Sequence, residues 1–361
     1  MYDGSIPCRH CIEESCPNEI FMSQVTLKDI ASILGVSVTT VSKALKDYPD
    51  ISNDTKHAVK LLADKLNYKP NIHAVTLRSN QSRTIGAILP KVDHQFFAET
   101  ITGIISEANI HGYQVIVLFS DESVATEERQ VDLLLEKRVD GILMSLANET
   151  NRFGHLHKVV KNQVPLVLFD KITRQVNCSK VIIDDEKAAY KAVNHMIKTG
   201  CRNIGILSGP EFPSNYNSRL RGYIRALEEH GMAYDDSRVF SCGHLSIEEG
   251  RENAETLLKN HPDTDGIFCI TDHIALGTIS YLNDAGIPVP GQVSVMGFSN
   301  WMITPYIKPH LSTVDQPSTQ MGKESASLLI NEIERKHKKQ PVEFYEIKLQ
   351  THLVLRETTR S

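Results

Sequence analysis

Acidic, guanidinium and aromatic side chains follow several buried-looking segments of the chain, where they could bind a small polar molecule. Carboxylate and guanidinium groups make directional hydrogen bonds to hydroxyl or acid groups, and aromatic rings cover apolar ring faces. Structural roles remain open for some of them, such as a helix cap for Asp272, a surface ion pair for Arg219 and a core side chain for Trp301. The candidate residues for a sugar-like ligand are Phe96, Phe97, Asp170, Arg219, Thr271, Asp272, Ser299, Asn300 and Trp301.

A second group of candidate residues lies near the N-terminus and is suited to reading DNA. Residues 26–45 (TLKDIASILGVSVTTVSKAL) have apolar positions at i, i+3 and i+4 spacing twice over, which predicts two short helices. Gly35 can end the first helix and Ser37 can cap the second. If Val41 and Leu45 face inward, four side chains of the second helix point outward, where a major groove would meet them: Val38, Thr39, Ser42 and Lys43. The alternative is a helical hairpin that serves only for packing.

A third helix should follow from Ser52 to the stop at Pro70, and it completes a three-helix core of the size that DNA-reading heads use. The next segment, 71–82, has weak helical periodicity, and a helix of that length is marginal without a partner. Leu77 in this segment has no evident core to enter. It could wedge into a minor-groove base step in a dimer, or it could cover the following domain.

Charge is distributed unevenly along the 361 residues, which carry 39 Lys and Arg against 44 Asp and Glu. Residues 22–84 have nine Lys and Arg and five Asp and Glu, whereas residues 1–21 have a net charge of -3 and the remainder has -6. A polyanionic partner is therefore expected for the first part of the chain only.

The long acidic part contains an internal duplication. The segments 84–90 (TIGAILP) and 203–209 (NIGILSG) read as equivalent buried strands, and the sequence Asp-Gly-Ile occurs at both 140–142 and 265–267. Helices that follow the first strands share a nine-residue step, from Gly103 to Gly112 and from Gly222 to Gly231. Two similar parallel α/β halves are predicted, with the carboxyl ends of their strands facing each other across a cleft. Those ends would position the candidate ligand-binding residues named above.

Together these motifs resemble the lactose-repressor (LacI/GalR) family of transcription regulators over residues 25–358. The segments that carry the resemblance are TLKDIA, LGVS, TVSKAL, NYKPN with a following hinge leucine, VDG and RLRGY. The resemblance implies a homodimer whose helix-turn-helix heads read a pseudo-palindromic operator in double-stranded DNA. It also implies a core of two doubly wound subdomains, similar to periplasmic binding proteins, in which a small effector controls operator affinity.

By motif match, the resemblance places Val38, Thr39 and Lys43 at base-reading positions and Leu77 at the minor-groove wedge. The full predicted DNA-binding set is Thr26, Ser37, Val38, Thr39, Thr40, Ser42, Lys43, Asn71, Ala74 and Leu77. The chain departs from the family at Lys43 and Val75, where arginine is usual. It also has Ser299 and Asn300 where the family usually has two aspartates, so its effector is expected to be more acidic than a neutral sugar or to contact these residues differently.

The predicted domains are an extension at 1–21, a helix-turn-helix domain at 22–70, a hinge at 71–83 and a core at 84–361. The extension is interpreted as disordered or as a start-site artefact, with Met22 as the alternative initiator. Subdomain one is expected to comprise 84–183 and 313–340, and subdomain two 184–312 and 341–358. Because no leucine-heptad tail follows Leu355, a dimer is favoured over a tetramer.

The expected function is a cytoplasmic, sequence-specific repressor controlled by a sugar or sugar-acid effector. We expect no cofactor, no metal site, no membrane association and no catalysis, since dinucleotide, phosphate-loop, nucleophile-elbow and metalloprotease motifs are missing. No apolar stretch approaches the length of about 20 residues that spans a membrane. The alternative function is a cytoplasmic sugar sensor or solute-binding protein that does not bind DNA.

Overall fold

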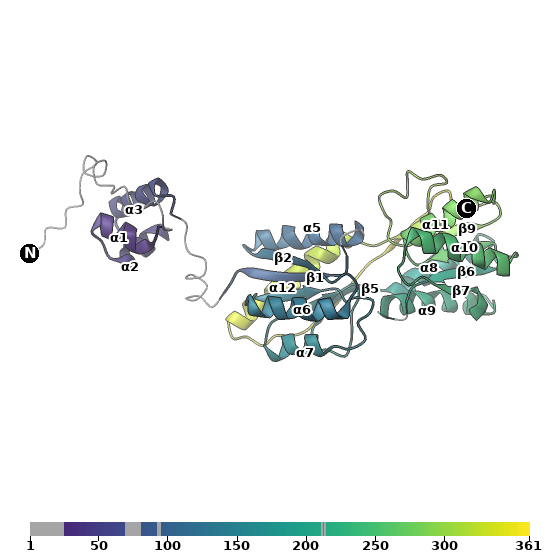
Figure 1. Cartoon of the computed structure of the whole chain (residues 1–361), viewed down its shortest axis with the longest axis horizontal. Helices are drawn as coiled ribbons and strands as arrows, with labels where there is room; N and C mark the ends of the chain where they lie inside the picture. Colours follow the sequence, from purple (N-terminus) through teal and green to yellow (C-terminus); the bar gives the residue numbers. More distant parts are fainter. Residues whose placement is uncertain (1–24, 69–80, 92–94, 211, 213) are drawn as a thin grey trace, which may run out of the picture. The chain divides into compact units, whose positions relative to one another are not determined.

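A computed structural model describes residues 25–68, 81–91, 95–210, 212 and 214–361. The chain divides into two compact units, residues 1–82 and 83–361, which we call the head and the core (Figure 1). The predicted extension 1–21 and residues 71–80 of the predicted hinge lie outside the described residues. The predictions for Asn71, Ala74 and Leu77 therefore fall outside them as well.

The described part of the head, residues 25–68, contains three helices, and the predicted caps lie at their ends. Helices α1 (Leu27–Leu34), α2 (Val38–Leu45) and α3 (Asn53–Lys65) follow one another in the chain. Gly35 ends α1 in the left-handed conformation, with φ of 64°, which costs glycine little. The Ser37 hydroxyl accepts a hydrogen bond from the Thr40 amide at 3.0 Å, and Ser52 caps α3 in the same way. These contacts confirm the predicted turn between α1 and α2.

One small apolar cluster holds the three helices of the head together. Val41 is fully buried, as predicted, and Leu45 packs partly buried against the cluster. The buried members are Ile30, Ala31, Leu34, Val41, Ala44, Val59, Leu62 and Ala63. Burying a side chain of this size stabilises a fold by about 1.5–3 kcal/mol, so a cluster this small supports only a minimal domain.

The first lobe of the core is built on a six-stranded parallel sheet with the order β11-β5-β4-β3-β1-β2. Helices α5 and α12 cover one face and α6 and α7 the other, as separate apolar clusters on alternating strand residues show. The strands are β1 (Thr84–Leu89), β2 (Gln114–Phe119), β3 (Gly141–Met144), β4 (Leu166–Phe169), β5 (Ser179–Ile183) and β11 (Glu346–Leu349). The helices are α5 (Gln95–Ile110), α6 (Val124–Glu136), α7 (Gly154–Lys161) and α12 (Ser318–His337).

The second lobe repeats this plan around a four-stranded parallel sheet with the order β7-β6-β8-β9. Helix α8 packs against α9, and α10 packs against α11. The strands are β6 (Ile204–Ser208), β7 (Val239–Ser241), β8 (Gly266–Cys269) and β9 (Ser294–Met296). The helices are α8 (Asp185–Lys198), α9 (Ser214–Glu229), α10 (Ile247–Asn260), α11 (Asp272–Asp284) and the short 3₁₀ helix η3 (Asp236–Arg238).

Equivalent glycines confirm the predicted duplication. Gly112 and Gly231 end α5 and α9 at φ of 71° and 67°, respectively. Gly103 lies where α5 crosses α12, and a β-carbon there would stand 2.2 Å from the Thr319 carbonyl oxygen. Gly222 has the same role where α9 crosses α8, with the Glu186 carbonyl oxygen also at 2.2 Å. In both lobes the paired helices approach so closely at these glycines that a β-carbon would clash with the neighbouring backbone.

Three chain segments connect the lobes, and they correct part of the predicted subdomain boundaries. The chain passes from β5 to α8, from β10 (Thr313–Asp315) to α12, and from β11 to β12 (His352–Val354). Strand β11 was expected in subdomain two, but it pairs with β5 at the edge of the first sheet. Strand β10 was expected in subdomain one, but it pairs with β12, and Asp315 bridges Ser299 in the second lobe. The lobe to which each of these strands belongs is thus set by its pairing with a distant segment of the chain.

None of the helices in the described part of the chain is both long enough and apolar enough to cross a lipid bilayer.

Candidate functional site

The predicted DNA-reading side chains lie together on the exposed side of α2 in the head. Ser37, Val38 and Thr39 are exposed, and Thr26 at the start of α1 is exposed as well. Thr40, Ser42 and Lys43 are half-buried. The Ser37 and Thr40 hydroxyl oxygens are 2.8 Å apart, so these two side chains also hold the start of α2. A role for these residues in DNA contact stays a prediction.

Lys43 has a partner that the sequence did not predict. Its ammonium group forms a hydrogen-bonded ion pair with Asp50, and this hydrogen bond lowers the pKa of the Asp50 carboxyl. The side chains of Lys43 and Asp50 are 40% and 51% exposed, so solvent screens the pair and it contributes little to folding stability. A phosphate or base that binds Lys43 would replace Asp50.

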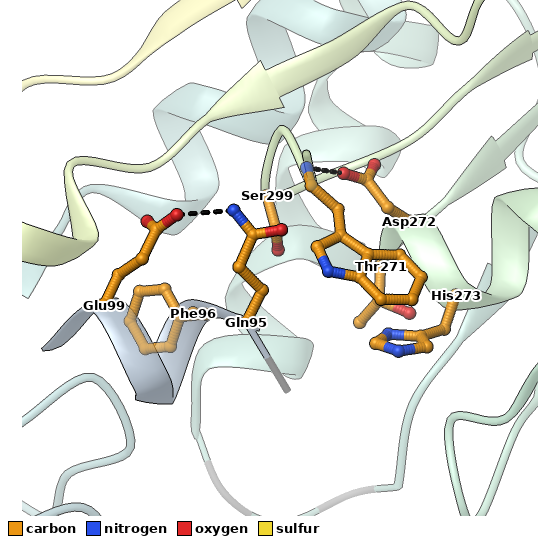
Figure 2. Close-up of a pocket in the computed structure, with 8 residues that line it drawn as sticks. Gln95, Phe96, Glu99, Thr271, Asp272, His273 and Ser299 are labelled. Carbon is orange, nitrogen blue, oxygen red and sulfur yellow. Dashed lines mark hydrogen bonds between the residues drawn. The ribbon is translucent and has the colours of Figure 1, made fainter. Parts of the chain in front are cut away.

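In the core, five of the predicted ligand-binding residues line one pocket between the lobes (Figure 2). The pocket encloses about 40 Å³. Residues of α5 in the first lobe face residues that follow β8 and β9 in the second lobe. The predicted lining residues are Phe96, Thr271, Asp272, Ser299 and Trp301, and the lining residues that were not predicted are Gln95, Glu99 and His273.

Two contacts involve side chains that line this pocket. The Trp301 ring stacks on the His273 ring, with centroids 4.3 Å apart. The Gln95 side-chain oxygen accepts a hydrogen bond from the Met302 amide at 2.6 Å, which joins α5 of the first lobe to the second lobe. Gln95 also donates to Glu99, as Figure 2 shows. Gln95 therefore bonds both to its own helix and to the second lobe beside this pocket.

Asp272 is buried at the back of the pocket, and both of its carboxylate oxygens accept hydrogen bonds. One oxygen accepts from the Thr313 hydroxyl and the other from the Trp301 amide, each at 2.7 Å. Burial raises the pKa of Asp272 to about 6, while these two hydrogen bonds oppose the shift. The carboxylate thus holds the loop after β9 against β10. The helix-cap position belongs to Thr271 instead, whose hydroxyl accepts from the Ile274 amide.

A cluster of buried charges lies deeper between the lobes. Arg219 is 2% exposed, and its guanidinium donates to the Asp185 carboxylate at 2.8 Å and to the Ile270 carbonyl at 2.7 Å. The same guanidinium lies 3.7 Å from the centroid of the Phe298 ring. The sequence left open a surface ion pair for Arg219. The structure shows instead that Arg219 and its partner Asp185 are both buried. Truncating either partner would leave an uncompensated buried charge.

Asp170 and Lys171 belong to the same cluster on the side of the first lobe. Burial raises the pKa of Asp170 to about 7, opposed by the nearby charge of Lys171. The Lys171 ammonium donates to Glu122 at 2.7 Å and to Asn148 at 2.6 Å, and it lies 5.8 Å from the Tyr216 ring of the second lobe. Within the described residues, no donor to the Asp170 carboxylate is found.

A second and larger cavity of about 270 Å³ lies beside the segment that joins β5 to α8. It also spans both lobes, since Lys348 of β11 and Asn215 of α9 both line it. Its charged lining has both signs: Arg174, Asp184, Asp185, Glu186, Arg221 and Lys348. Asp185 connects this cavity with the charged cluster through its bond to Arg219.

The structure thus brings most of the predicted ligand-binding residues to the space between the lobes. Phe97 and Phe96 pack edge to face with ring centroids 5.2 Å apart, but only Phe96 lines the first pocket. Asn300 is held outside the pocket lining by Asp315 and Arg356. Sequence reasoning missed Gln95 and His273, which each stand one residue from a predicted position.

Residues of the charged cluster were missed as well. Lys171 directly follows Asp170 and could have been found by extending the predicted strand end by one residue. Glu122, Asn148 and Asp185 carry no signal in the sequence, because their partners come from distant segments. No group of three or more His, Cys, Asp or Glu residues suited to a metal ion was found among the described residues.

Comparison with protein families gives two matches that divide the chain as the structure does. Residues 26–71 match the model for "Bacterial regulatory proteins, lacI family". Residues 82–349 match the model for "Periplasmic binding proteins and sugar binding domain of LacI family". The first range contains the head helices, and the second begins at the boundary of the core.

Individual relatives agree with these matches. The chain is 34% identical to catabolite control protein A of Priestia megaterium, over 84% of this chain and 91% of the relative. It is 32% identical to the transcriptional repressor CytR of Escherichia coli K12, over 86% and 91%. A solved complex of the transcriptional regulator CelR with cellobiose superposes with a TM-score of 0.70 at 26% identity, covering 92% of this chain and 99% of that one. The chain therefore belongs to the LacI family of bacterial regulatory proteins and is a DNA-binding transcriptional regulator with a periplasmic-binding-protein-like core.

Proposed function

We propose that this regulator represses transcription at a pseudo-palindromic operator and that a small polar effector between the lobes controls its operator affinity. The observation that carries the proposal is the first pocket, whose lining comes from both lobes and beside which the Gln95–Met302 hydrogen bond joins the lobes. A ligand in this pocket would contact both lobes, and a ligand that pushes them apart would have to break or replace that bond. It would therefore bind the open and closed arrangements with different affinity, which is the requirement for control.

The proposed effector is a sugar or sugar acid. A volume of about 40 Å³ holds little more than one water molecule, whereas ligand pockets commonly measure about 300–1,000 Å³. The lobes must therefore separate, or the ligand must also use the second cavity. That cavity offers hydrogen-bonding groups in Asn215 and Ser218 and cations in Arg221 and Lys348. The second cavity has three Lys and Arg residues and three carboxylates, whereas the first pocket has Glu99 and Asp272 and, among the described residues, no Lys or Arg in its wall, so an acidic group fits better in the second cavity. Cellobiose in the related CelR complex supports the carbohydrate class.

We place the regulator in the cytoplasm as a homodimer, because two heads are needed for two half-sites and the DNA is there. We assign no reaction to the buried charges between the lobes, and no cofactor. Asp272, Arg219 and Lys171 all bond to the chain's own groups, which supports a binding function for the space between the lobes.

A thermal-shift screen of the full chain against neutral sugars, sugar acids and sugar phosphates tests the proposed effector. A ligand present at a hundred times its Kd should stabilise the core by about 2.7 kcal/mol. The same ligand should change the operator Kd by about 5–150-fold, and operator DNA should change the ligand Kd by the same factor. A ligand that shifts the melting curve without changing operator affinity would contradict effector control.

The predicted DNA-reading surface has a separate test. Lys43→Ala should weaken binding to the duplex that the wild-type chain enriches from a random library by about 1–3 kcal/mol, measured by fluorescence anisotropy. Lys46→Ala, one residue beyond α2, is the matched control. Equal losses in both variants would contradict a reading role for Lys43.

A further inference from the structure

The two ends of the first sheet carry opposite charge. We define the strand-start edge as the segments that directly precede five of its strands, namely 83, 110–113, 136–140, 161–165 and 334–345. These segments contain eight Lys and Arg and four Asp and Glu. The segments that follow β1 to β5 contain four Lys and Arg and six Asp and Glu. These segments are 90–94, 120–123, 145–153, 170–178 and 184. The strand-start edge is thus a cationic surface on an acidic core.

Hydrogen bonds show that these segments lie side by side. The Arg83 amide donates to Asp140 at 2.8 Å, and its guanidinium reaches the His111 carbonyl at 3.5 Å. The Lys336 ammonium donates to the Gln163 carbonyl at 2.5 Å. The end of α12 therefore lies beside the turn before β4, at the end of the lobe where β1 begins (Figure 1).

Several cations of this edge are not engaged in folding the core. Lys137, Arg138, Lys161 and Lys339 are exposed, and none of their side chains has an ion pair or hydrogen bond with another described residue. Lys338 pairs only with Glu334, at 3.5 Å and in solvent. Such a pair contributes about 0–1 kcal/mol and is exchanged at little cost.

Helix ends explain part of this charge, but not all of it. Helices α5, α6, α7 and α12 end at this edge, and a helix C-terminus carries about half a negative charge that basic residues complement. The four helix C-termini together balance about two of the eight positive charges, and the four carboxylates balance four more. About two positive charges remain on each chain.

The chain also limits how far this edge can be from DNA that the head holds. Helix α3 ends at Lys65 and β1 begins at Thr84. The connecting segment cannot exceed about 3.3–3.6 Å per residue, or roughly 65 Å in all, when fully extended. This length allows a DNA duplex bound by the head to contact the edge, and such a duplex offers a phosphate about every 1.7 Å.

We propose that the strand-start edge of the first lobe binds phosphates of the DNA that the head recognises, and so adds sequence-independent affinity from the core. The proposal rests on the DNA-binding function of the head. It assigns Lys137, Lys161 and Lys339 to phosphate contacts that form only on DNA.

The test compares the full-length wild-type chain with the triple variant Lys137→Gln, Lys161→Gln, Lys339→Gln. The probe is a 40-base-pair duplex carrying the sequence that the wild-type chain enriches from a random library, titrated by fluorescence anisotropy from about 0.05 to 0.3 M salt. Each phosphate that the variant no longer neutralises should make the log–log salt slope shallower by about 0.9. We expect the triple variant to bind about tenfold more weakly at low salt and to have a shallower slope.

A matched control removes three exposed lysines from the second lobe through Lys198→Gln, Lys259→Gln and Lys308→Gln. It changes the net charge equally and should leave the slope unchanged. An unchanged slope in the first variant, or an equal change in both, would overturn the proposal. A wild-type chain that enriches no sequence would instead contradict the function of the head. Melting curves of both variants verify that their folds are intact.

Discussion

Two buried aspartates lie near the boundary between the lobes, and they differ in how many hydrogen bonds their carboxylates accept. Both oxygens of Asp272 in the second lobe accept hydrogen bonds from the chain's own groups. Asp170 in the first lobe is buried as well, yet within the described residues its carboxylate has no donor. Burial costs a carboxylate its hydration unless hydrogen bonds replace the water. The comparison assigns Asp272 a structural role, whereas the Asp170 carboxylate holds no other described residue by a hydrogen bond.

The largest expected effect concerns Asp272. Asp272→Ala leaves the Trp301 amide and the Thr313 hydroxyl without their acceptor, and each buried donor left unpaired costs about 1–3 kcal/mol. We expect the free energy of unfolding of the core to fall by about 2–5 kcal/mol in chemical denaturation. Asp170→Ala, the matched control, should cost much less, because it removes no hydrogen bond. An equal loss of unfolding free energy in the two variants would contradict the structural role assigned to the hydrogen bonds of Asp272.

The second prediction uses the protonation of Asp170. Its pKa is raised from 3.8 to about 7 in the folded core, so folding favours the protonated acid. The stability of the wild-type chain relative to Asp170→Asn should therefore be fully present below about pH 4 and should be lost as the pH rises through about 7. Unfolding midpoints of both proteins at pH 5 and pH 8 measure this difference.

Asp272 titrates in the same direction, since its pKa is raised to about 6. Because Asp272 is present in both proteins, its contribution cancels when they are subtracted. An identical pH dependence in the wild type and in Asp170→Asn would show that Asp170 is ionised in the folded chain as it is in the unfolded one.

The smallest expected effect concerns the hydrogen bond that joins α5 of the first lobe to the second lobe. Gln95→Ala removes the acceptor of the Met302 amide, and a hydrogen bond of this kind contributes about 0.5–1.5 kcal/mol. Hydrogen–deuterium exchange at Met302 should become roughly 2–10-fold faster, in proportion to that energy. Gln95→Glu keeps an acceptor and should retain slow exchange. Unchanged exchange in Gln95→Ala would show that the lobes are held together elsewhere.

Local patterns predicted the elements, because each element is determined by its own residues. Gly35, Ser37 and Ser52 identified the ends of the head helices, since a cap acts within three residues of itself. The repeated glycine step from Gly103 to Gly112 identified the duplicated halves. Placing ligand residues after strands also found five residues of the first pocket.

Long-range pairing could not be predicted in the same way. Strand β11 joins a partner more than 160 positions earlier in the chain, and no periodicity shows which sheet it enters. Lys171, Glu122 and Asn148 form one hydrogen-bonded group from three separate loops. Asn300 looked like a ligand-binding residue because it follows a strand, but Arg356 from the C-terminal segment occupies its side chain. Such contacts depend on the whole topology rather than on spacing.

The tight glycine crossing of α5 and α12 has a mechanical consequence. A side chain at Gly322 would stand 2.0 Å from the Thr100 carbonyl oxygen, so the two helices have no slack in which to slide. Helix α5 spans 16 residues, or about 24 Å, from Gln95 at the pocket to Ile110 beside the segment that begins β1. Helix α5 therefore connects the pocket to the end of the lobe where the chain enters from the head, and its close crossing with α12 restricts how far it can shift.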